Sequence, residues 1–429
     1  MALIDATLYR HDSTSEGSWH RWELACATIA IFLSAANFLR LDAFYFTLSD
    51  AFCCLSICMR LISGGLPVRP FGRVGTTLWF AGVLLLGFGL AFSSLFTQAP
   101  ARGLVILGQY LFAYIIILFV ISGRTFADTL FLARAYVLSI VLMCLHGIYV
   151  IHWSGERNTA FVSGNGRLTG FAERENECAS LIALALPLLL LLASSGRVKP
   201  WVLAAAIPVM LYAILLTGSN TGLASFAYGL FVFLILNLSW KGMVAAGASI
   251  VGFLLTAWES GRDYMPVVFQ RRVLSALESG DLSMAGSFQH RLELIHEALG
   301  KVESSFWIGL GADQFPVISA VRQPVHNVYL LLWTEGGAVS AIGFCVMLLG
   351  SVWAIARAFR APGGRVVGAC ALVNVTLFAL MANAFPHLYA RFWSVPVILP
   401  LCLAQNFWFE QRLRGRLAAE GATWLRALG

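Results

Sequence analysis

Apolar stretches of about twenty residues, separated by short polar segments, run along almost the whole chain. A transmembrane helix needs about 20 mainly apolar residues, because the hydrocarbon core of a bilayer is about 30 Å thick. A window of that length predicts spans near residues 22–39, 44–62, 76–96, 104–122, 127–152, 178–194, 201–217, 221–239, 243–258, 328–356, 367–385 and 392–409. The expected fold class is all-α: a polytopic integral membrane protein with about twelve transmembrane helices in a single membrane domain, residues 1–429.

The composition agrees with this pattern. Hydrophobic residues make up 59% of the chain and charged residues 12%, and the mean hydropathy is +0.78. Soluble domains carry about 25% charged residues, whereas a surface that faces lipid needs little charge. Nearly all of the nine cysteines fall inside apolar spans, which argues against disulfides and against a zinc site. The first twenty residues are polar and lack the pattern of a cleavable signal peptide.

Lys and Arg are distributed unevenly between the two sides of the predicted spans. Cytoplasmic loops of membrane proteins carry an excess of these residues. With a cytoplasmic N-terminus, sixteen of them lie in inside segments, and the short outside loops hold only Arg40, Arg102 and Arg391. This bias predicts that both termini are cytoplasmic, and it accounts for the net charge of +7 without a nucleic-acid partner.

Two outside segments depart from this bias. They are a first functional periplasmic loop, residues 153–177, and a large periplasmic loop, residues 259–327. Membrane insertion disfavours positive charge on the outside, so the basic residues of these segments need an explanation, and anion binding is one. The alternative is that long loops are translocated regardless of their charge. Together the two segments hold Arg157, Arg167, Arg174, Arg262, Arg271, Arg272, Arg291, Lys301 and Arg322.

The large loop carries helical patterns. In SFQHRLELIHEALGKV, apolar residues recur at alternating four- and three-residue steps, as on one face of an amphipathic helix. We expect this face to be buried and Arg291 to border it, and we expect a second helix around PVVFQRRVLSALESG. Such helices would form a helical periplasmic cap over a cavity. The predicted buried face consists of Phe288, Leu292, Ile295, Leu299 and Val302.

Four motifs follow one another between about residues 165 and 343. GRLTGFAERENECASLIALALPLLL has Arg-Leu-x-Gly, then Asn176, then an apolar helix, and LLTGSNTGLAS is a short outside turn. FQHRLELIHEALGKVESSFWIGLGADQF joins an Arg-led helix to a Gly-x-Gly turn, and VHNVYLLLWTEGGAVSAIG has a His-Asn pair and a Glu-Gly pair. In this ordered set the chain resembles the O-antigen ligase and polymerase family of bacterial surface polysaccharide synthesis. It differs at Asn220, where the family's turn often carries Arg.

The resemblance implies a glycosyltransferase of the bacterial inner membrane with a periplasmic active site and no cofactor. Its partners would be an undecaprenyl-diphosphate-linked glycan as donor, a saccharide acceptor and membrane lipid. A polymerase would join O-antigen or exopolysaccharide repeat units, using a lipid-linked repeat unit as acceptor. An O-antigen ligase would transfer polymer to lipid A-core. The motifs leave both open, and we slightly favour polymerisation.

Transfer from such a donor leaves a lipid diphosphate, whose extra negative charge needs a metal or a set of Arg and Lys. The sequence has no Asp-x-Asp pair and no His/carboxylate cluster at metal-ligand spacing, whereas its outside loops are rich in Arg. Arg matches phosphate bidentately, so we expect a metal-independent enzyme with Arg291 as the main diphosphate contact. The alternative for Arg291 is a snorkelling side chain at the membrane border. Further candidates for substrate binding are Arg167, Arg174, Asn176, Arg271 and Arg272.

His326 is the second expected catalytic residue. A neutral imidazole can remove the proton of an attacking sugar hydroxyl near neutral pH. The alternative is a histidine that only hydrogen-bonds backbone where a spanning helix begins. The neighbouring Asn327 is a candidate for substrate binding.

Four other positions are worth following. Glu335 is expected at intramembrane depth, where ionisable residues are costly and usually face a cavity, so it is a candidate for substrate binding. The same argument applies to Arg134 in the fifth span. His387 and Tyr389, in the outside turn AFPHLYAR, are expected near the rim of the cavity.

Two rival classes stay open. Twelve spans with both termini inside would also suit a multi-spanning transporter or a lipid-linked glycan flippase. Two features argue against a transporter or flippase. The two halves of the chain show no repeat symmetry, and a long outside segment lies late in the chain. A non-catalytic assembly subunit would not require Arg291 and His326 together on the outside face.

Overall fold

The computed structural model describes residues 14–41, 45–63, 65–97, 100–155, 157–238, 266–271 and 288–427. A short antiparallel pair, β1 (Arg40–Leu41) and β2 (Phe46–Thr47), accompanies a bundle of helices. The longer helices of the first half are α1 (Thr14–Leu33), α2 (Leu48–Ile62), α3 (Gly72–Ser94), α4 (Pro100–Leu111), α5 (Ile117–Ile121), α6 (Phe126–Tyr149), α7 (Glu175–Ser194), α8 (Pro200–Thr217) and α9 (Asn220–Asn237). The second half contains α11 (Val267–Phe269), α13 (Phe288–Ser304), α14 (Phe315–Ile318), α15 (Val328–Arg360), α16 (Arg365–Met381) and α17 (Arg391–Ala427).

Eight helices among the described residues are long and apolar enough to cross a membrane. The spanning segments are α3, α4 continued through a π-helical turn (Phe112–Ile116) into α5, α6 with its π-helical extension to Ser154, α7, α8, α9, α15 and α17 as far as Leu417. The helices α1, α2 and α16 occupy three other predicted spans, and the predicted span 243–258 lies outside the described residues. A polytopic helical protein is thus supported, while a total of about twelve spans stays a prediction.

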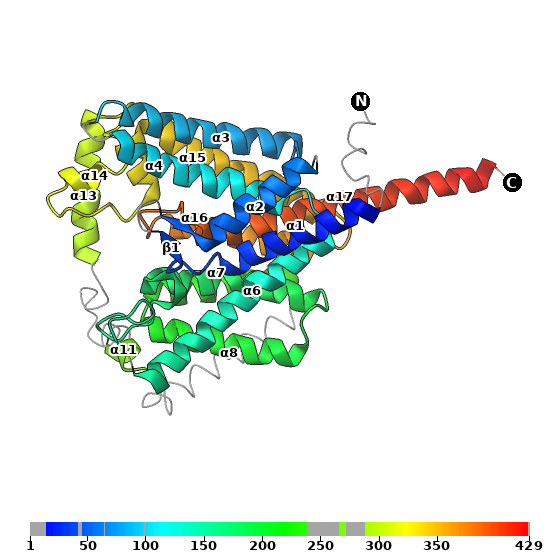
Figure 1. Ribbon diagram of the computed structural model, residues 1–429, viewed down its shortest axis with the longest axis horizontal. Helices are drawn as coiled ribbons and strands as arrows, with labels where there is room; N and C mark the ends of the chain where they lie inside the picture. Colours follow the sequence, from blue (N-terminus) through cyan, green and yellow to red (C-terminus); the bar gives the residue numbers. More distant parts are fainter. Residues whose placement is uncertain are drawn as a thin grey trace.

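Small residues let α3 and α15 pack closely. A Cβ on Gly82 would lie 2.3 Å from the Met347 nitrogen, and a Cβ on Gly343 would lie 2.4 Å from the Leu86 nitrogen. Close backbone approach at small residues is the usual way in which membrane helices associate. The two helices lie side by side in Figure 1 and run antiparallel, since Gly75 faces Gly350, Gly82 faces Gly343 and Gly89 faces Gly336.

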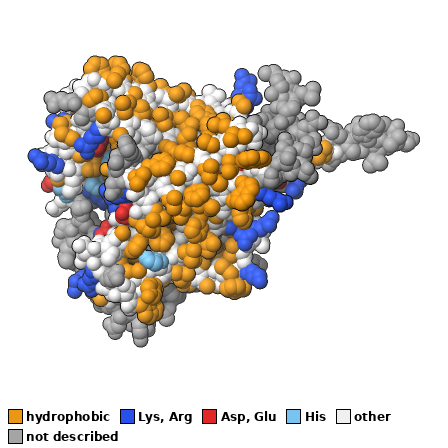
Figure 2. Space-filling view, viewed as in Figure 1, with side chains coloured by type: hydrophobic (Ala, Val, Ile, Leu, Met, Phe, Trp, Pro, Cys, Tyr) orange, Lys and Arg blue, Asp and Glu red, His pale blue; other side chains and the backbone are white. Residues whose placement is uncertain are grey.

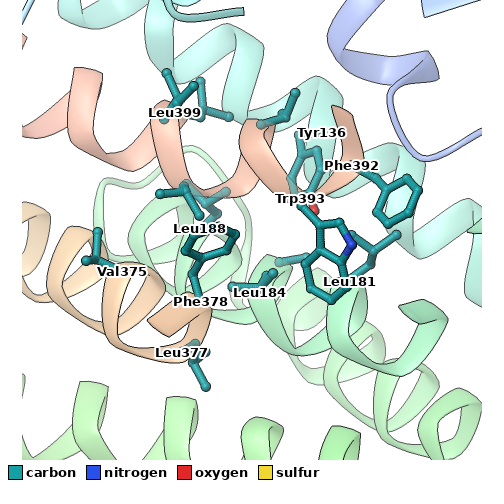
Figure 3. Close-up of a cluster of buried hydrophobic side chains, with 14 of the residues drawn as sticks. Tyr136, Leu181, Leu184, Leu188, Val375, Leu377, Phe378, Phe392, Trp393 and Leu399 are labelled. Carbon is teal, nitrogen blue, oxygen red and sulfur yellow. The ribbon is translucent and has the colours of Figure 1, made fainter. Parts of the chain in front are cut away.

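The centre of the bundle is α7, in which every residue from Cys178 to Leu192 is buried. A helix that is apolar all round has no side suited to water and is expected in an interior. Figure 3 shows Leu184 packing near Phe378 of α16 and Trp393 of α17. The residues that follow or precede α7 are thereby held against a rigid core.

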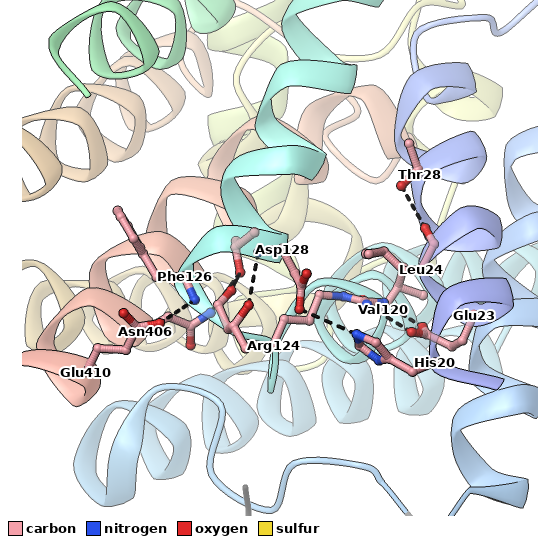
Figure 4. Close-up of polar contacts among 12 residues, drawn as sticks. His20, Glu23, Leu24, Thr28, Val120, Arg124, Phe126, Asp128, Asn406 and Glu410 are labelled. Atoms are coloured by element: carbon pink, nitrogen blue, oxygen red, sulfur yellow. Dashed lines mark hydrogen bonds and ion pairs between the residues drawn. The ribbon is translucent and has the colours of Figure 1, made fainter. Parts of the chain in front are cut away.

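Polar contacts tie three helices together near one end of the bundle (Figure 4). Arg124 Nη1 donates to Glu23 Oε2 at 2.8 Å, and both side chains are buried. Glu410 Oε1 accepts from the Phe126 backbone nitrogen at 2.8 Å. Buried charges are tolerated when paired in this way, so α1, the start of α6 and α17 are joined by ion pairing and hydrogen bonding.

The two ends of the bundle differ in content. In Figure 1, α13 and α14 lie at the left end, whereas the described beginning of α1 and the end of α17 lie at the right. The predicted first loop, the start of α15 and the turn between α16 and α17 also lie at the end of α13. The chain therefore places its candidate residues at the end opposite its described termini.

A candidate anion-binding site at one end of the bundle

Figure 2 shows a hollow at the left edge of the molecule in which basic, acidic and histidine side chains meet, beside a broad hydrophobic face. This is the end that carries α13. The segments that build it are the loop before α7, α13 with the chain that follows it, the start of α15 and the turn 382–390. Segments far apart in the sequence thus contribute polar side chains to one end of an apolar bundle.

The helix predicted in the large loop is confirmed as α13, but its predicted buried face is right only in part, at Val302 and at the half-buried Ile295. Leu292 and Leu299, which were expected to be buried, are each 45% exposed, whereas Leu294 and Ala298, which were not, are fully buried. Leu294, Ala298 and Val302 form a small core together with Phe315 and with Leu330 and Leu331 of α15. The small Ala298 side chain allows close packing, and a pattern of large apolar residues does not register such a position.

Arg291 continues the buried face of α13. It lies three residues before Leu294, and residues three or four apart share one side of a helix. Its side chain is half-buried, and its charge acts on the imidazole of His326, which precedes α15. The structure therefore brings Arg291 and His326, separated by 35 positions in the chain, within electrostatic range of each other.

His326 stands between the buried Val325 and the first residues of α15. Its Nδ1 is buried and has no hydrogen-bond partner among the described residues. Burial, followed by the charges of Arg291 and Arg174, lowers the pKa of His326 to about 4, and a hydrogen bond with the backbone of Pro324 opposes this shift. The imidazole is therefore neutral at physiological pH and within electrostatic range of two arginine side chains.

His387 and Tyr389 join this group from the turn before α17. The two rings lie 5.2 Å apart between centroids. Burial, followed by the charges of Arg174 and His326, lowers the pKa of His387 to about 3. Burial, aided by the carboxylate of Asp313, raises the pKa of Tyr389, so its hydroxyl stays a donor. The sequence indicated this part of the site only through the presence of a histidine and a tyrosine in one short outside turn.

Arg174 is the most exposed cation of the group. It is the residue before α7, its side chain is 68% exposed, and its Nη1 lies 3.9 Å from Glu177 Oε1. Its charge lowers the pKa of both His326 and His387. Arg174 is therefore within electrostatic range of both histidines, and its exposed side chain is accessible to a ligand.

Arg167 has a different environment, because its side chain is buried and directed into the protein. Its Nε donates to the Thr217 carbonyl at 2.7 Å, and its Nη1 lies 3.4 Å from Glu175 Oε1. A further contact joins its Nη2 to Asn176 Oδ1 at 3.5 Å. These contacts favour a role for Arg167 and Asn176 in fixing the first loop against the end of α8, and their contact with substrate stays a prediction.

Asn327 caps α15. Its Oδ1 accepts from the Leu330 nitrogen at 3.0 Å, and its Nδ2 donates to Asn383 Oδ1 at 3.3 Å. Asparagine is a preferred N-cap because its oxygen satisfies a free helix nitrogen. The side chain is thus engaged in holding the residue after His326, and its predicted substrate contact is untested.

The Gly-x-Gly turn fits into a kink of α15. Gly337 has φ 70° and ψ −179°, a conformation almost restricted to glycine. The Leu310 nitrogen donates to the Thr334 carbonyl at 2.9 Å, and the Gly311 nitrogen donates to the Glu335 carbonyl at 2.8 Å. A Cβ on Gly309 would lie 2.5 Å from the Gly337 nitrogen. The turn therefore supplies the hydrogen bonds that the kinked helix lacks and fixes the chain between α13 and α15.

Glu335 lies at this kink. It is 4% exposed, and its Oε1 accepts from the Phe315 nitrogen at 3.3 Å. Nearby, Arg102 Nε of α4 donates to Oδ2 of Asp313, which lies in the segment between α13 and α14. Glu335 is thus engaged with the backbone of the loop, which favours a positioning role, and its direct contact with substrate stays a prediction.

The remaining cationic candidates are placed only in part. Arg271 is exposed and follows the short helix α11, whereas Arg272 and most of the predicted second helix lie outside the described residues. Within the described ranges, no three His, Cys, Asp or Glu side chains gather where they could hold a metal ion. Metal independence stays a prediction.

These observations define a class: a polytopic helical membrane protein with a basic, histidine-containing site at one end of its bundle. A family model described as O-antigen ligase matches residues 205–345, about a third of the chain. Over this segment the chain is similar to the O-antigen ligase family, and the match supports the predicted resemblance and a glycosyl-transferring role in O-antigen assembly. A search of curated proteins found no match.

The matched segment runs from α8 into α15. It contains Arg291, His326, Asn327 and Glu335, whereas Arg174 and His387 lie outside it. The site thus combines residues of the family segment with residues that the rest of the chain contributes.

Proposed function

We propose that the protein transfers a glycan from an undecaprenyl-diphosphate-linked donor to a hydroxyl group of a saccharide acceptor. The observation that carries the proposal is the grouping of Arg291, Arg174 and His326 at one end of an apolar bundle. A lipid-linked donor keeps its prenyl chain in the membrane and its diphosphate at the surface. Cations at that surface can bind the diphosphate of the donor, and a neutral imidazole beside them can accept the proton of the acceptor hydroxyl.

Arg291 and Arg174 bind the diphosphate in this proposal. As the bond between the anomeric carbon and the phosphate oxygen breaks, the leaving undecaprenyl diphosphate gains negative charge. Guanidinium groups stabilise such charge through paired hydrogen bonds. Arg291 is held on a buried helix face, whereas Arg174 is exposed, so Arg291 is the preorganised member of the pair.

His326 acts as the general base. The acceptor hydroxyl oxygen attacks the anomeric carbon, and its proton passes to the imidazole. A histidine with a pKa of about 4 is a weak base in the free protein. Because two arginines contribute to the low pKa, an incoming diphosphate offsets their charge and raises the pKa. Donor binding thereby turns His326 into an effective base.

This coupling predicts a specific pH dependence. An opposite charge within about 4–6 Å shifts a pKa by roughly 1–3 units. The acid limb of kcat/KM reports the free enzyme and should lie near the pKa of about 4, whereas the acid limb of kcat should lie roughly 1–3 pH units higher. Initial rates measured from below pH 4 up to pH 8 test this, and coincident acid limbs would contradict the coupling.

The proposal also assigns a location. The protein would lie in the bacterial inner membrane with both termini cytoplasmic and the site periplasmic. Support comes from the sixteen basic residues in the predicted inside segments against three in the short outside loops. The described chain ends also lie at the end of the bundle away from the site (Figure 1).

Purified protein in proteoliposomes, supplied with undecaprenyl-diphosphate-linked repeat units and a saccharide acceptor, tests the activity. We expect release of undecaprenyl diphosphate and a lengthened glycan, at the same rate with and without EDTA. Loss of turnover in EDTA would refute metal independence. An unchanged donor pool, with movement of the donor across the bilayer, would assign the protein to the flippases.

A further inference from the structure

A second cavity lies away from the proposed site, between α1, α6, α7 and α8. Its volume is about 580 Å³, within the range of ligand pockets. The lining is almost entirely apolar and includes Phe32 of α1, Val141 of α6, Leu192 of α7 and Val202 of α8. Such a cavity in a membrane protein suits a hydrocarbon chain.

One charged residue, Arg134, lines this cavity. It is exposed, and it makes no hydrogen bond or ion pair with any described residue. It lies eight residues after Phe126, roughly 12 Å along α6 from the helix start at 1.5 Å per residue. An ionisable side chain at this depth is costly unless a partner compensates it.

Two more cations stand at the same end of the cavity. Val198, in the connection between α7 and α8, lines the cavity, and its neighbours Arg197 and Lys199 are both exposed. Figure 2 shows basic side chains along the right-hand edge of the hydrophobic face, the end at which α6 and α8 begin. No acidic residue is among the lining residues. Apolar space and positive charge therefore adjoin each other.

We propose that this cavity binds an anionic phospholipid, with an acyl chain in the apolar space and the phosphate on Arg134. The positive charge at the mouth argues for an anionic headgroup over a zwitterionic one. The glycan donor is not the occupant, because its diphosphate belongs at the end of α13, whereas this cavity reaches the α7–α8 connection at the other end. The lipid site is thus separate from the proposed transfer reaction.

The test is a titration of detergent-solubilised protein with dioleoyl-phosphatidylglycerol, followed by thermal shift. We expect phosphatidylglycerol to raise the melting temperature more than phosphatidylcholine, and glycerol phosphate without acyl chains to have no effect. Removing one cation costs about fivefold in affinity for an anionic lipid. Arg134→Gln should therefore raise the phosphatidylglycerol concentration at half-saturation roughly fivefold. Equal responses of Arg134→Gln and wild type would overturn the proposal.

A second variant tests the apolar part. Val202→Phe fills the cavity and leaves Arg134 unchanged, so it should also weaken binding of phosphatidylglycerol. Normal binding by this variant would refute insertion of an acyl chain. Gel filtration confirms that both variants are folded, and Arg416→Gln on the exposed end of α17 is the matched charge control.

Discussion

Replacing His326 with alanine should lower the rate of glycan transfer by about 10²- to 10⁴-fold, the usual contribution of a general base. The imidazole is neutral, its Nδ1 has no partner among the described residues, and it lies within range of Arg291. Its removal takes away the proton acceptor but none of the cations. We therefore expect kcat to fall while the affinity for the donor changes little, as measured by turnover of the purified protein.

The control for this variant is His296→Ala. His296 is an exposed histidine on α13, in the same predicted loop, and has no place in the proposed site. It should keep the wild-type rate. If His326→Ala also kept that rate, His326 would be only a residue at a helix start, and the proposed base would be refuted.

Replacing Gly337 with alanine should have the second large effect, on folding. A Cβ at this position would lie 2.0 Å from the Trp307 carbonyl oxygen, and the backbone has φ 70°. A side chain in this region of backbone space costs about 3 kcal/mol. The clash would also push the Gly309–Gly311 turn out of the kink and displace α13 with Arg291. We expect a lower melting temperature in detergent and loss of transfer.

Gly108→Ala is the matched control for Gly337→Ala. Gly108 lies inside α4, and a Cβ there would meet nothing within 4 Å. Alanine is favoured over glycine in a helix interior by roughly 0.5–1 kcal/mol, so this variant should be as stable as wild type or slightly more stable. A Gly337→Ala protein with a wild-type melting temperature and rate would show that the kink tolerates a side chain.

The helices could be predicted from the sequence because long apolar stretches leave few alternatives. The predicted spans within the described residues each contain a helix, and α13 was expected from its period. The face that α13 buries could be predicted only in part. Leu292 and Leu299 are larger than Ala298, yet the contact with Phe315 and α15 requires the smaller residue.

The site could be predicted only as separate candidates. Arg291 and His326 stand out by residue type and motif, but their proximity depends on how α13 packs on the start of α15. Arg167 illustrates the opposite case. It stands in a Gly-rich outside loop, as an anion-binding residue would, yet its guanidinium contacts the Thr217 carbonyl inside the protein. Sequence alone does not distinguish an arginine that faces a ligand from one that holds a loop.

A polymerase and a ligase share the proposed step and differ in the acceptor. The intermediate that accumulates without the protein separates them. Lipid-linked single repeat units would indicate a polymerase, and full-length polymer still attached to undecaprenyl diphosphate would indicate a ligase.

The lipid-linked glycan profile of a deletion strain complemented with Arg291→Ala tests the central claim most directly. We predict that this variant, expressed at the wild-type level, leaves the same intermediate as the deletion, because the leaving diphosphate loses its main cation. Arg416→Ala, an exposed arginine at the far end of α17, should restore the wild-type profile. Full rescue by Arg291→Ala, or a deletion strain with an unchanged profile, would contradict the proposed site.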